Sequence, residues 1–419
     1  MDQRKNQKQK ILIDRFRCLN NYGSGMMGLV VLNELHKRLG DKAEFYFPSN
    51  GFSSIEEIQS ELPGEVPLYI HKEPEIQWSR YKWGRSLQKR KYLVDISEIK
   101  HYDTIIVLGG DDLSEYYTDK IYRDLLKYWR WSISKRVVLL GQSMGPFENR
   151  KNRFVIKYLY RKIPVFARDE WTTRYLKEEF GLEKNVFQSA DLAFMDLPLQ
   201  HDRQIESEIL NRYRLEPNRY LTFVLSGLAG KYYTKDKAEY FRNFQRIIEY
   251  ILQDARFEGD KIVLLAHTFP PHADEGKLIK EFMEFVPRNL HEKLVPVTEK
   301  ILQTRARFIL GNGKLTVTGR MHAAVSTFQM GKPAVSLSYS AKYQGVIGRN
   351  LNRSDLIIEA DNDHLWKSGE IAGQVINKIN YVLENYERLQ REIQAKVRLQ
   401  KQRVKESFDR LSGKQPIHP

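Results

Sequence analysis

Residues 104–112 have the sequence T-I-I-V-L-G-G-D-D, a short β-branched run that ends in two glycines and two acidic residues. The apolar run predicts a buried β-strand over residues 104–108, and the glycines predict a tight turn directly after it. A helical pattern follows over residues 113–131. Strand, glycine turn and helix in this order are typical of a parallel sheet with crossover helices, in which the turn lies at the carboxyl edge.

The same alternation extends along the chain in both directions. Besides residues 104–108, the expected strands are 11–16, 43–47, 137–141, 164–167, 220–225, 261–266, 294–297, 315–318 and 334–338. The other expected helices are 27–39, 170–180, 238–253, 275–285, 299–308 and 321–330. The pattern pauses between Asp196 and Asn218 and then restarts, which divides the strands into two series. We therefore expect an α/β protein with two Rossmann-like domains that face each other across a cleft.

The expected domain ranges are residues 1–196, 197–362 and 363–419. The last range carries one long helical pattern from about residue 364 to residue 411, with an apolar stripe and a basic opposite face. Packing of this stripe against the chain's own domains and self-association are both compatible with the pattern.

Composition limits the classes of function. The 419 residues carry a net charge of +15, which suits nucleic acid, an anionic membrane surface or an acidic substrate. Residues 80–91 form the densest basic stretch and include two aromatic residues. The single cysteine, Cys18, the absence of a signal peptide and the absence of a long apolar run predict a cytoplasmic protein.

Glycine loops and polar residues follow the expected strands of the first half. Gly23, Gly25 and Gly28 form a G-x-G-x-x-G pattern, but no acidic residue ends the next strand, so we do not expect a dinucleotide site. Asp111 and Gln142 follow two neighbouring strands and are expected at one edge. Arg168 ends another strand, where anion binding and an Arg-Asp ion pair that holds the two domains together are equally compatible with the sequence.

The second half contains a strand-to-helix junction at Gly319, Arg320 and His322. A helix N-terminus attracts anions, an arginine adds a permanent charge, and a histidine can exchange a proton near neutral pH. Lys342 follows the next expected strand and adds a second cation. His267 and His272 flank two prolines, a spacing that does not fit a helical zinc pair, and we predict no metal site.

Seven segments, in this order and spacing, resemble the polysaccharide pyruvyl transferase family. They are Asn21 with Gly23, Gly109 with Gly110, G-Q-S-M-G-P at 141–146, A-R-D at 167–169, S-A-D-L-A-F at 189–194, G-R-M-H-A at 319–323 and Y-S-A-K at 339–342. The resemblance implies a fold like that of the GT-B glycosyltransferases. It also implies transfer of a pyruvyl group from phosphoenolpyruvate, as co-substrate, to two hydroxyls of a hexose, which forms a ketal without a metal or other cofactor.

The resemblance also implies roles for individual residues. The donor site is expected at four residues, namely Arg168, Gly319, Arg320 and Lys342, with His322 and Arg320 as catalytic residues. The acceptor is expected against the first domain, at Asn21, Gly23, Asp111 and Gln142. Family acceptors are often glycans on a lipid carrier, which implies peripheral association with the inner face of the membrane. The sequence does not predict an oligomeric state.

Two other functions remain open as alternatives. A GT-B glycosyltransferase for a nucleotide sugar would have the same fold, but the residues after Lys342 offer no carboxylate for ribose hydroxyls. A non-enzymatic nucleic-acid-binding function would account for the net positive charge but would not explain why Arg320 and His322 stand together. We therefore do not expect nucleic acid as a partner.

Overall fold

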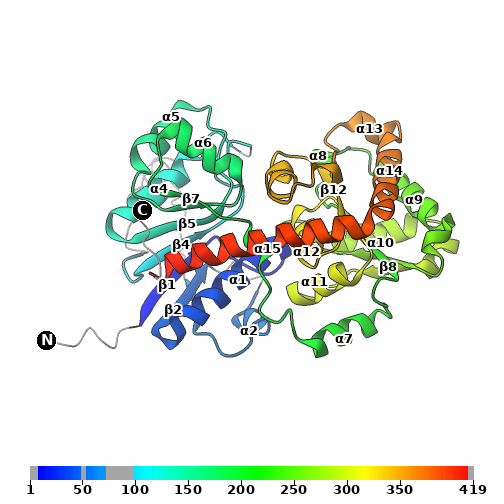
Figure 1. Ribbon diagram of the computed structural model, residues 1–419, viewed down its shortest axis with the longest axis horizontal. Helices are drawn as coiled ribbons and strands as arrows, with labels where there is room; N and C mark the ends of the chain where they lie inside the picture. Colours follow the sequence, from blue (N-terminus) through cyan, green and yellow to red (C-terminus); the bar gives the residue numbers. More distant parts are fainter. Residues whose placement is uncertain (1–7, 49–52, 72–98, 117, 414–419) are drawn as a thin grey trace, which may run out of the picture. The chain divides into compact units, whose positions relative to one another are not determined.

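The computed structural model describes residues 8–48, 53–71, 99–116 and 118–413. The chain divides into two compact units. The first unit comprises Met1–Cys18, Met27–Leu192 and Gln402–Pro419, and the second comprises Leu19–Met26 and Ala193–Lys401. Each unit has one parallel sheet with helices on both of its faces (Figure 1).

The sheet of the first unit has the strand order β3-β2-β1-β4-β5-β6-β7, and all its pairs are parallel. Its strands are β1 (Gln9–Asp14), β2 (Ala43–Pro48), β3 (Leu68–His71), β4 (Thr104–Leu108), β5 (Arg136–Gln142), β6 (Val165–Ala167) and β7 (Val186–Gln188). Its helices are α1 (Tyr22–Leu39), α2 (Ile55–Gln59), α4 (Tyr122–Ser134), α5 (Arg150–Phe154) and α6 (Glu170–Phe180). The first turn of α1 belongs to the second unit.

The sheet of the second unit has the order β10-β9-β8-β11-β12-β13 and is also parallel. Its strands are β8 (Tyr220–Val224), β9 (Lys261–Leu265), β10 (Leu294–Val297), β11 (Thr316–Thr318), β12 (Ala334–Ser338) and β13 (Ile357–Glu359). Its helices are α7 (Arg203–Arg212), α8 (Ala229–Tyr232), α9 (Lys237–Gln253), α10 (Glu275–Phe285), α11 (Gln303–Asn312), α12 (Met321–Gln329), α13 (Asp363–Lys367), α14 (Glu370–Glu384) and α15 (Tyr386–Leu411), the last of which continues into the first unit.

The predicted α/β class is confirmed, and each sheet has the Rossmann order, in which the order of strands reverses beside the first strand of the unit. Continuous apolar runs such as T-I-I-V-L in β4 form these strands because all five residues are buried. In the first unit, apolar residues of α4 and α6 pack on β4 and β5 in one cluster. In the second unit, Trp366 packs against Tyr240 of α9, with ring centroids 5.0 Å apart.

Several predicted boundaries are wrong for local reasons. The helix expected from residue 113 begins at Tyr122, because Leu113 instead forms a β-bridge with Met144. The helix expected from residue 299 begins at Gln303, since Leu302 has a φ of 67°. The single C-terminal helix is three helices, interrupted at Gly369, whose φ is 79°, and at Asn385.

The compact units also differ from the expected domain ranges. Leu19–Met26, which includes the first turn of α1, belongs to the second unit, and Gln402–Pro419 belongs to the first. The basic stretch at residues 80–91 lies outside the described residues.

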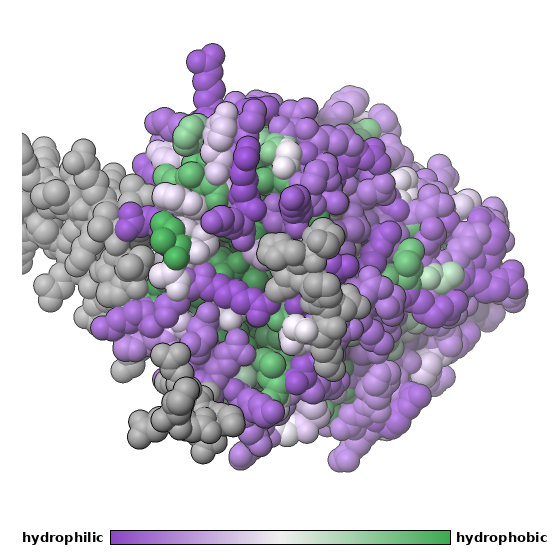
Figure 2. Space-filling view, turned by 60° about the vertical axis from the view of Figure 1, so that its left-hand side comes forward, coloured by the Kyte–Doolittle hydropathy of each residue, from purple (hydrophilic) through white to green (hydrophobic). Residues whose placement is uncertain are grey.

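The face in Figure 2 is mostly hydrophilic, and its apolar side chains form small, separate patches. In the described part of the chain, none of the helices combines the length and the apolarity that crossing a bilayer requires.

Candidate functional site

The junction between β11 and α12 lies at the point where the strand order of the second sheet reverses. β11 pairs with β8, and the chain leaves β11 through Gly319 and enters α12 at Met321. In open α/β sheets, ligands bind outside the carboxyl ends of the strands at such a point. The N-terminus of α12 adds a partial positive charge there, and Arg320 stands directly before its first turn.

Gly319 is packed too closely to carry a side chain. A Cβ atom at this position would lie 2.7 Å from Tyr233 Oη. Two buried phenols surround its carbonyl: Tyr343 Oη donates to Gly319 O at 2.8 Å, and Tyr233 Oη lies 3.3 Å from the same oxygen while it donates to Leu337 O at 2.7 Å. Burial raises the pKa of both tyrosines well above 10, so both remain neutral donors. The position of the backbone before α12 is therefore rigidly defined.

Arg320 is held by a buried carboxylate, Glu275, from the first turn of α10. Arg320 Nε donates to Glu275 Oε1 at 2.6 Å, and the two side chains are 11% and 0% exposed. Burial disfavours the charge on Arg320, but Glu275 outweighs it, so the pKa of Arg320 is raised. Arg320 Nη2 is buried and has no hydrogen-bond partner in the described structure. One nitrogen of the guanidinium is thus anchored, and a second is buried without a partner among the described residues.

Glu275 also connects the site to the loop after β9. Its Oε1 accepts a hydrogen bond from Gly227 N at 3.0 Å, and its Oε2 accepts one from His267 N at 2.9 Å. His267 is 1% exposed. Burial lowers the pKa of His267 well below 6.5, and the charges of Arg320, His322 and Arg307 lower it further. The imidazole of His267 is therefore neutral in the folded protein.

This depressed pKa predicts a loss of stability in acid. Below about pH 6.5, the histidine of the unfolded chain binds a proton that native His267 does not bind, so unfolding is favoured as the pH falls. As the pH falls, we expect the free energy of unfolding of the wild type to decrease more steeply than that of His267→Gln, by up to about 1.4 kcal/mol per pH unit. Urea unfolding between pH 5 and pH 8 measures this difference. Free energies of unfolding that change equally with pH in the wild type and in His267→Gln would contradict this prediction.

Asn21 and Gly23, which were predicted as acceptor-binding residues of the first domain, belong to the second unit, and Gly23 lies beside His322. Asn21 forms an antiparallel bridge with Thr268, and Tyr22 N donates to His267 O at 3.2 Å. A Cβ atom on Gly23 would lie 2.2 Å from His322 Nδ1. This long-range pairing draws the first turn of α1 to the partly exposed His322, which is the second residue of α12.

Lys342 lies on the same edge, after β12. Its Nζ is 4.7 Å from the centroid of the Tyr339 ring and donates to Tyr339 Oη at 3.1 Å. Tyr339 and Tyr343 are among the groups that raise the pKa of Arg320. Gly319, Arg320, His322 and Lys342 are thus linked through direct neighbours in one part of the second unit.

Asp111 and Gln142, which were predicted to bind the acceptor, have hydrogen bonds within the first unit. Gln142 is 1% exposed, and its Nε2 donates to Val107 O at 3.2 Å and to Leu108 O at 3.1 Å. Asp111 lies on the turn after β4, where its carbonyl accepts a hydrogen bond from Ser114. The amide nitrogen of Gln142 thus binds main-chain carbonyls at the end of β4, whereas Asp111 is partly exposed.

Arg168 forms an ion pair inside the first unit. Its Nη1 is 2.9 Å from Asp191 Oδ2, and the side chains are 1% and 0% exposed. Its Nε also donates to Ser143 Oγ at 2.9 Å. Burial opposes the charge, but Asp191 and other aspartates raise the pKa of Arg168. The structure contains an Arg-Asp ion pair, but both partners belong to the first unit, so this pair is not one between the two domains.

Sequence reasoning missed Glu275 and the two phenols that fix Gly319. Glu275 follows Asp274, the N-cap of α10, and a pair of acidic residues at a helix start indicates only a capped helix. Tyr233 and Tyr343 lie far from Gly319 in the sequence, so no local pattern indicates their role. The spacing of His267 and His272 argues against a zinc pair and indicates nothing further about His267.

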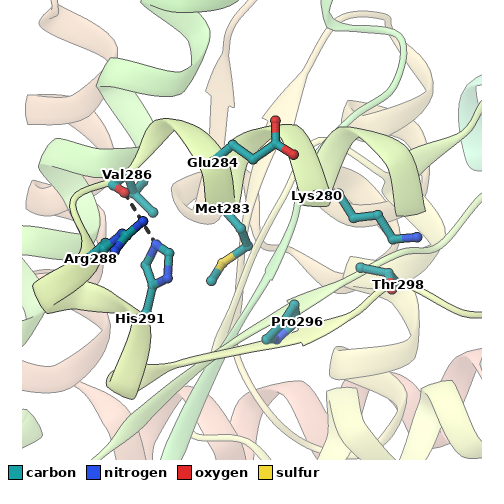
Figure 3. A pocket seen from close by; sticks show the side chains of 8 residues that line it. All are labelled: Lys280, Met283, Glu284, Val286, Arg288, His291, Pro296 and Thr298. Carbon is teal, nitrogen blue, oxygen red and sulfur yellow. Dashed lines mark hydrogen bonds between the residues drawn. The ribbon is translucent and has the colours of Figure 1, made fainter.

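A separate cavity of about 590 Å³ lies between α10 and the edge strand β10 (Figure 3). Its lining consists of Lys280, Met283, Glu284, Val286, Arg288, His291, Pro296 and Thr298. His291 Nε2 lies 3.3 Å from Val286 O, the contact drawn as a dashed line in Figure 3. This lining includes none of the predicted site residues, so the cavity is distinct from the Arg320 region.

Known structures share the fold. The S. aureus MnaA–UDP structure matches with a TM-score of 0.57 and 12% identity, over 92% of this chain and 90% of the other. The UDP-GlcNAc 2-epimerase of Neisseria meningitidis bound to UDP-GlcNAc matches with a TM-score of 0.58 and 10% identity, over 92% and 94%. At these identities the likeness concerns the fold alone, which is GT-B-like as expected.

Sequence comparison is more specific. The amylovoran biosynthesis protein AmsJ of Erwinia amylovora is 21% identical over 409 residues, which cover 92% of this chain and 94% of that protein. The family model for polysaccharide pyruvyl transferase matches residues 21–341, a range that contains both the glycine loops of the first half and the Gly319–Lys342 region up to Ala341. Because this match spans most of the chain, the protein belongs to the polysaccharide pyruvyl transferase family.

Proposed function

We propose that the protein transfers the pyruvyl group of phosphoenolpyruvate to two hydroxyls of a hexose in a polysaccharide or its lipid-linked precursor, and forms a cyclic ketal. The observation that carries this proposal is the arrangement of Arg320, with one buried nitrogen lacking a partner, before α12 and beside His322. Phosphoenolpyruvate carries a carboxylate and a phosphate, and a fixed guanidinium with a helix N-terminus suits such groups.

The reaction requires two carbon–oxygen bonds to form at C2 of the donor and the bond from C2 to the phosphate oxygen to break. The methylene carbon accepts one proton, and the two hydroxyls together release two, of which the second leaves with inorganic phosphate. In the proposal, Arg320 and Lys342 stabilise the donor's negative charge, and His322 transfers a proton to the methylene carbon or from an attacking hydroxyl.

The test is incubation of the purified protein with phosphoenolpyruvate and a panel of hexosides. The expected result is phosphate release that depends on the acceptor, together with a product heavier by one pyruvyl ketal. The same panel with UDP-glucose in place of phosphoenolpyruvate tests the nucleotide-sugar alternative. Transfer of glucose from UDP-glucose, with no ketal formed from phosphoenolpyruvate, would contradict the proposed function and support the nucleotide-sugar alternative.

A lipid-linked acceptor would bring the protein to an anionic membrane surface. The net charge of +15 favours such an association, which salt would weaken. Sedimentation with vesicles that contain anionic lipid, at physiological salt, tests this part of the proposal. Lack of binding to the vesicles would contradict membrane association and would not affect the proposed ketal chemistry.

Gly23→Ala is expected to lower the rate of pyruvyl transfer while the fold is retained. The new methyl group would lie 2.2 Å from His322 Nδ1 and 2.9 Å from His322 Cβ, so the whole imidazole has to move. Displacement of a reacting group by about 1 Å can cost roughly 100-fold in rate, and we expect a loss of that order in kcat.

Gly230→Ala is the matched control, because a Cβ atom on Gly230 meets no atom within 4 Å. It should leave kcat within about twofold, as expected for a surface substitution. Equal rates for Gly23→Ala and Gly230→Ala would show that the position of His322 does not matter for transfer.

A further inference from the structure

His267 is a buried imidazole that takes no part in the chemistry proposed above. It follows β9, is 1% exposed, and packs edge-to-face on Tyr22 with ring centroids 5.2 Å apart. Its Nε2 is buried and, within the described part of the chain, forms no hydrogen bond. A buried polar atom without a partner costs stability, so its retention calls for an explanation.

His267 and Arg320 each have one buried nitrogen without a partner among the described residues, and both residues bind the same carboxylate through other atoms. Glu275 binds Arg320 through Oε1 and the backbone of His267 through Oε2. The two residues follow β11 and β9, the strands on either side of β8. The ring of His267 packs on Tyr22, and the next residue, Gly23, lies beside His322.

The chemistry of these two nitrogens fits an oxyanion. A guanidinium nitrogen is only a donor, and a neutral imidazole has one N–H donor. Because His267 stays neutral, it can donate to an anion without adding a second positive charge beside Arg320. One carboxylate or phosphate group, with two or more acceptor oxygens, would satisfy both nitrogens together.

We propose that His267 Nε2 and Arg320 Nη2 together bind one oxyanion group of the donor, with Glu275 as the residue that positions both. This inference rests on the proposed function for the identity of the donor. It assigns His267 to binding and leaves proton transfer to His322.

Calorimetric titration of wild type, His267→Met and His267→Gln with phosphoenolpyruvate tests the assignment. Methionine keeps the apolar bulk but removes the donor, whereas the amide of glutamine can donate from about the same position. A hydrogen bond to a charged group is lost in His267→Met, so we expect its Kd to rise roughly tenfold or more. His267→Gln should stay within about threefold of the wild type, and kcat at saturating donor should change little in both.

Titration with inorganic phosphate and with pyruvate identifies the group that is bound. A loss of affinity in His267→Met for phosphate alone assigns the phosphate, and a loss for pyruvate alone assigns the carboxylate. Equal Kd values for phosphoenolpyruvate in wild type and His267→Met would overturn the inference and leave the proposed function standing. Wild-type protein that binds phosphate through His267 but ignores phosphoenolpyruvate would overturn the proposed function and leave this oxyanion site.

A measurement on the wild type covers the case in which His267→Met does not fold. In protein labelled with ¹⁵N-histidine, the His267 signal is assigned by its absence from the spectrum of His267→Gln. Its Nε2 resonance should shift when phosphoenolpyruvate is added. An unchanged resonance at saturating donor, or a His267→Gln variant that binds as weakly as His267→Met, would also overturn the inference.

Discussion

Glu275→Gln is expected to lower the free energy of unfolding of the second unit by about 3–5 kcal/mol, because it leaves the buried Arg320 charge without its counter-ion. Arg320 and Glu275 are 11% and 0% exposed, so water cannot replace the lost charge. In the wild type, the backbone N–H groups of Gly227 and His267 donate to the Glu275 carboxylate. The NH₂ group of the glutamine amide would face one of these donors and could not accept its hydrogen bond. Hydrogen exchange of peptides from α10 and α12, measured against urea concentration, reports this loss.

Glu281→Gln is the matched control on the same helix. Glu281 pairs with Lys237 at 3.0 Å, but the two side chains are 32% and 58% exposed. An exposed pair of this kind contributes about 0–1 kcal/mol, so the control should unfold nearly as the wild type does. Peptides from the first unit should exchange alike in all variants. Identical protection of α12 in Glu275→Gln and Glu281→Gln would show that Arg320 does not depend on Glu275.

A double variant separates the ion pair from the other contacts of Glu275. Arg320→Met removes the cation, so Glu275→Gln in that background no longer strands a buried charge. The loss in the double variant should be smaller than the sum of the two single losses by roughly 1–3 kcal/mol. Strict additivity would assign the whole effect of Glu275→Gln to its backbone hydrogen bonds.

The strands could be predicted because burial on both faces of a parallel sheet leaves a local signal. β4, β10 and β12 begin and end at the predicted residues, and all five residues of β12 are buried. Short strands at the sheet edges were missed, among them β3, in which two of four residues are exposed, and β13. Their runs of four and three residues are too short for a periodic pattern to be recognised.

The candidate site could be predicted only where one segment carries its chemistry. Gly319, Arg320 and His322 lie within four positions at a strand-to-helix junction, which a sequence reader can recognise. The partner of Arg320 comes from another helix, 45 positions earlier, because strand order brings Glu275 to the same edge. Gly23 reaches His322 through the bridge from Asn21 to Thr268, a contact that no local pattern indicates.

His322→Ala is expected to lower the rate of pyruvyl transfer by about 10²–10⁴-fold, the usual contribution of a positioned acid or base. His322 lies in the first turn of α12 and is partly exposed, so its removal leaves no large cavity. The Kd for phosphoenolpyruvate should change little, because the proposed anion contacts come from Arg320, Lys342, His267 and the helix N-terminus. Steady-state kinetics and calorimetric titration of the same preparations separate the two quantities.

His272→Ala is the control, since His272 is an exposed histidine of the loop after β9 and should retain the wild-type rate. The two site histidines then have opposite signatures. His322→Ala should reduce kcat at unchanged Kd, whereas His267→Met should raise Kd at nearly unchanged kcat. A loss of kcat below tenfold in His322→Ala would remove this residue from proton transfer. If His267→Met instead lost kcat by the larger factor, the proton would have to move through His267, and the division of roles between the two imidazoles would be reversed.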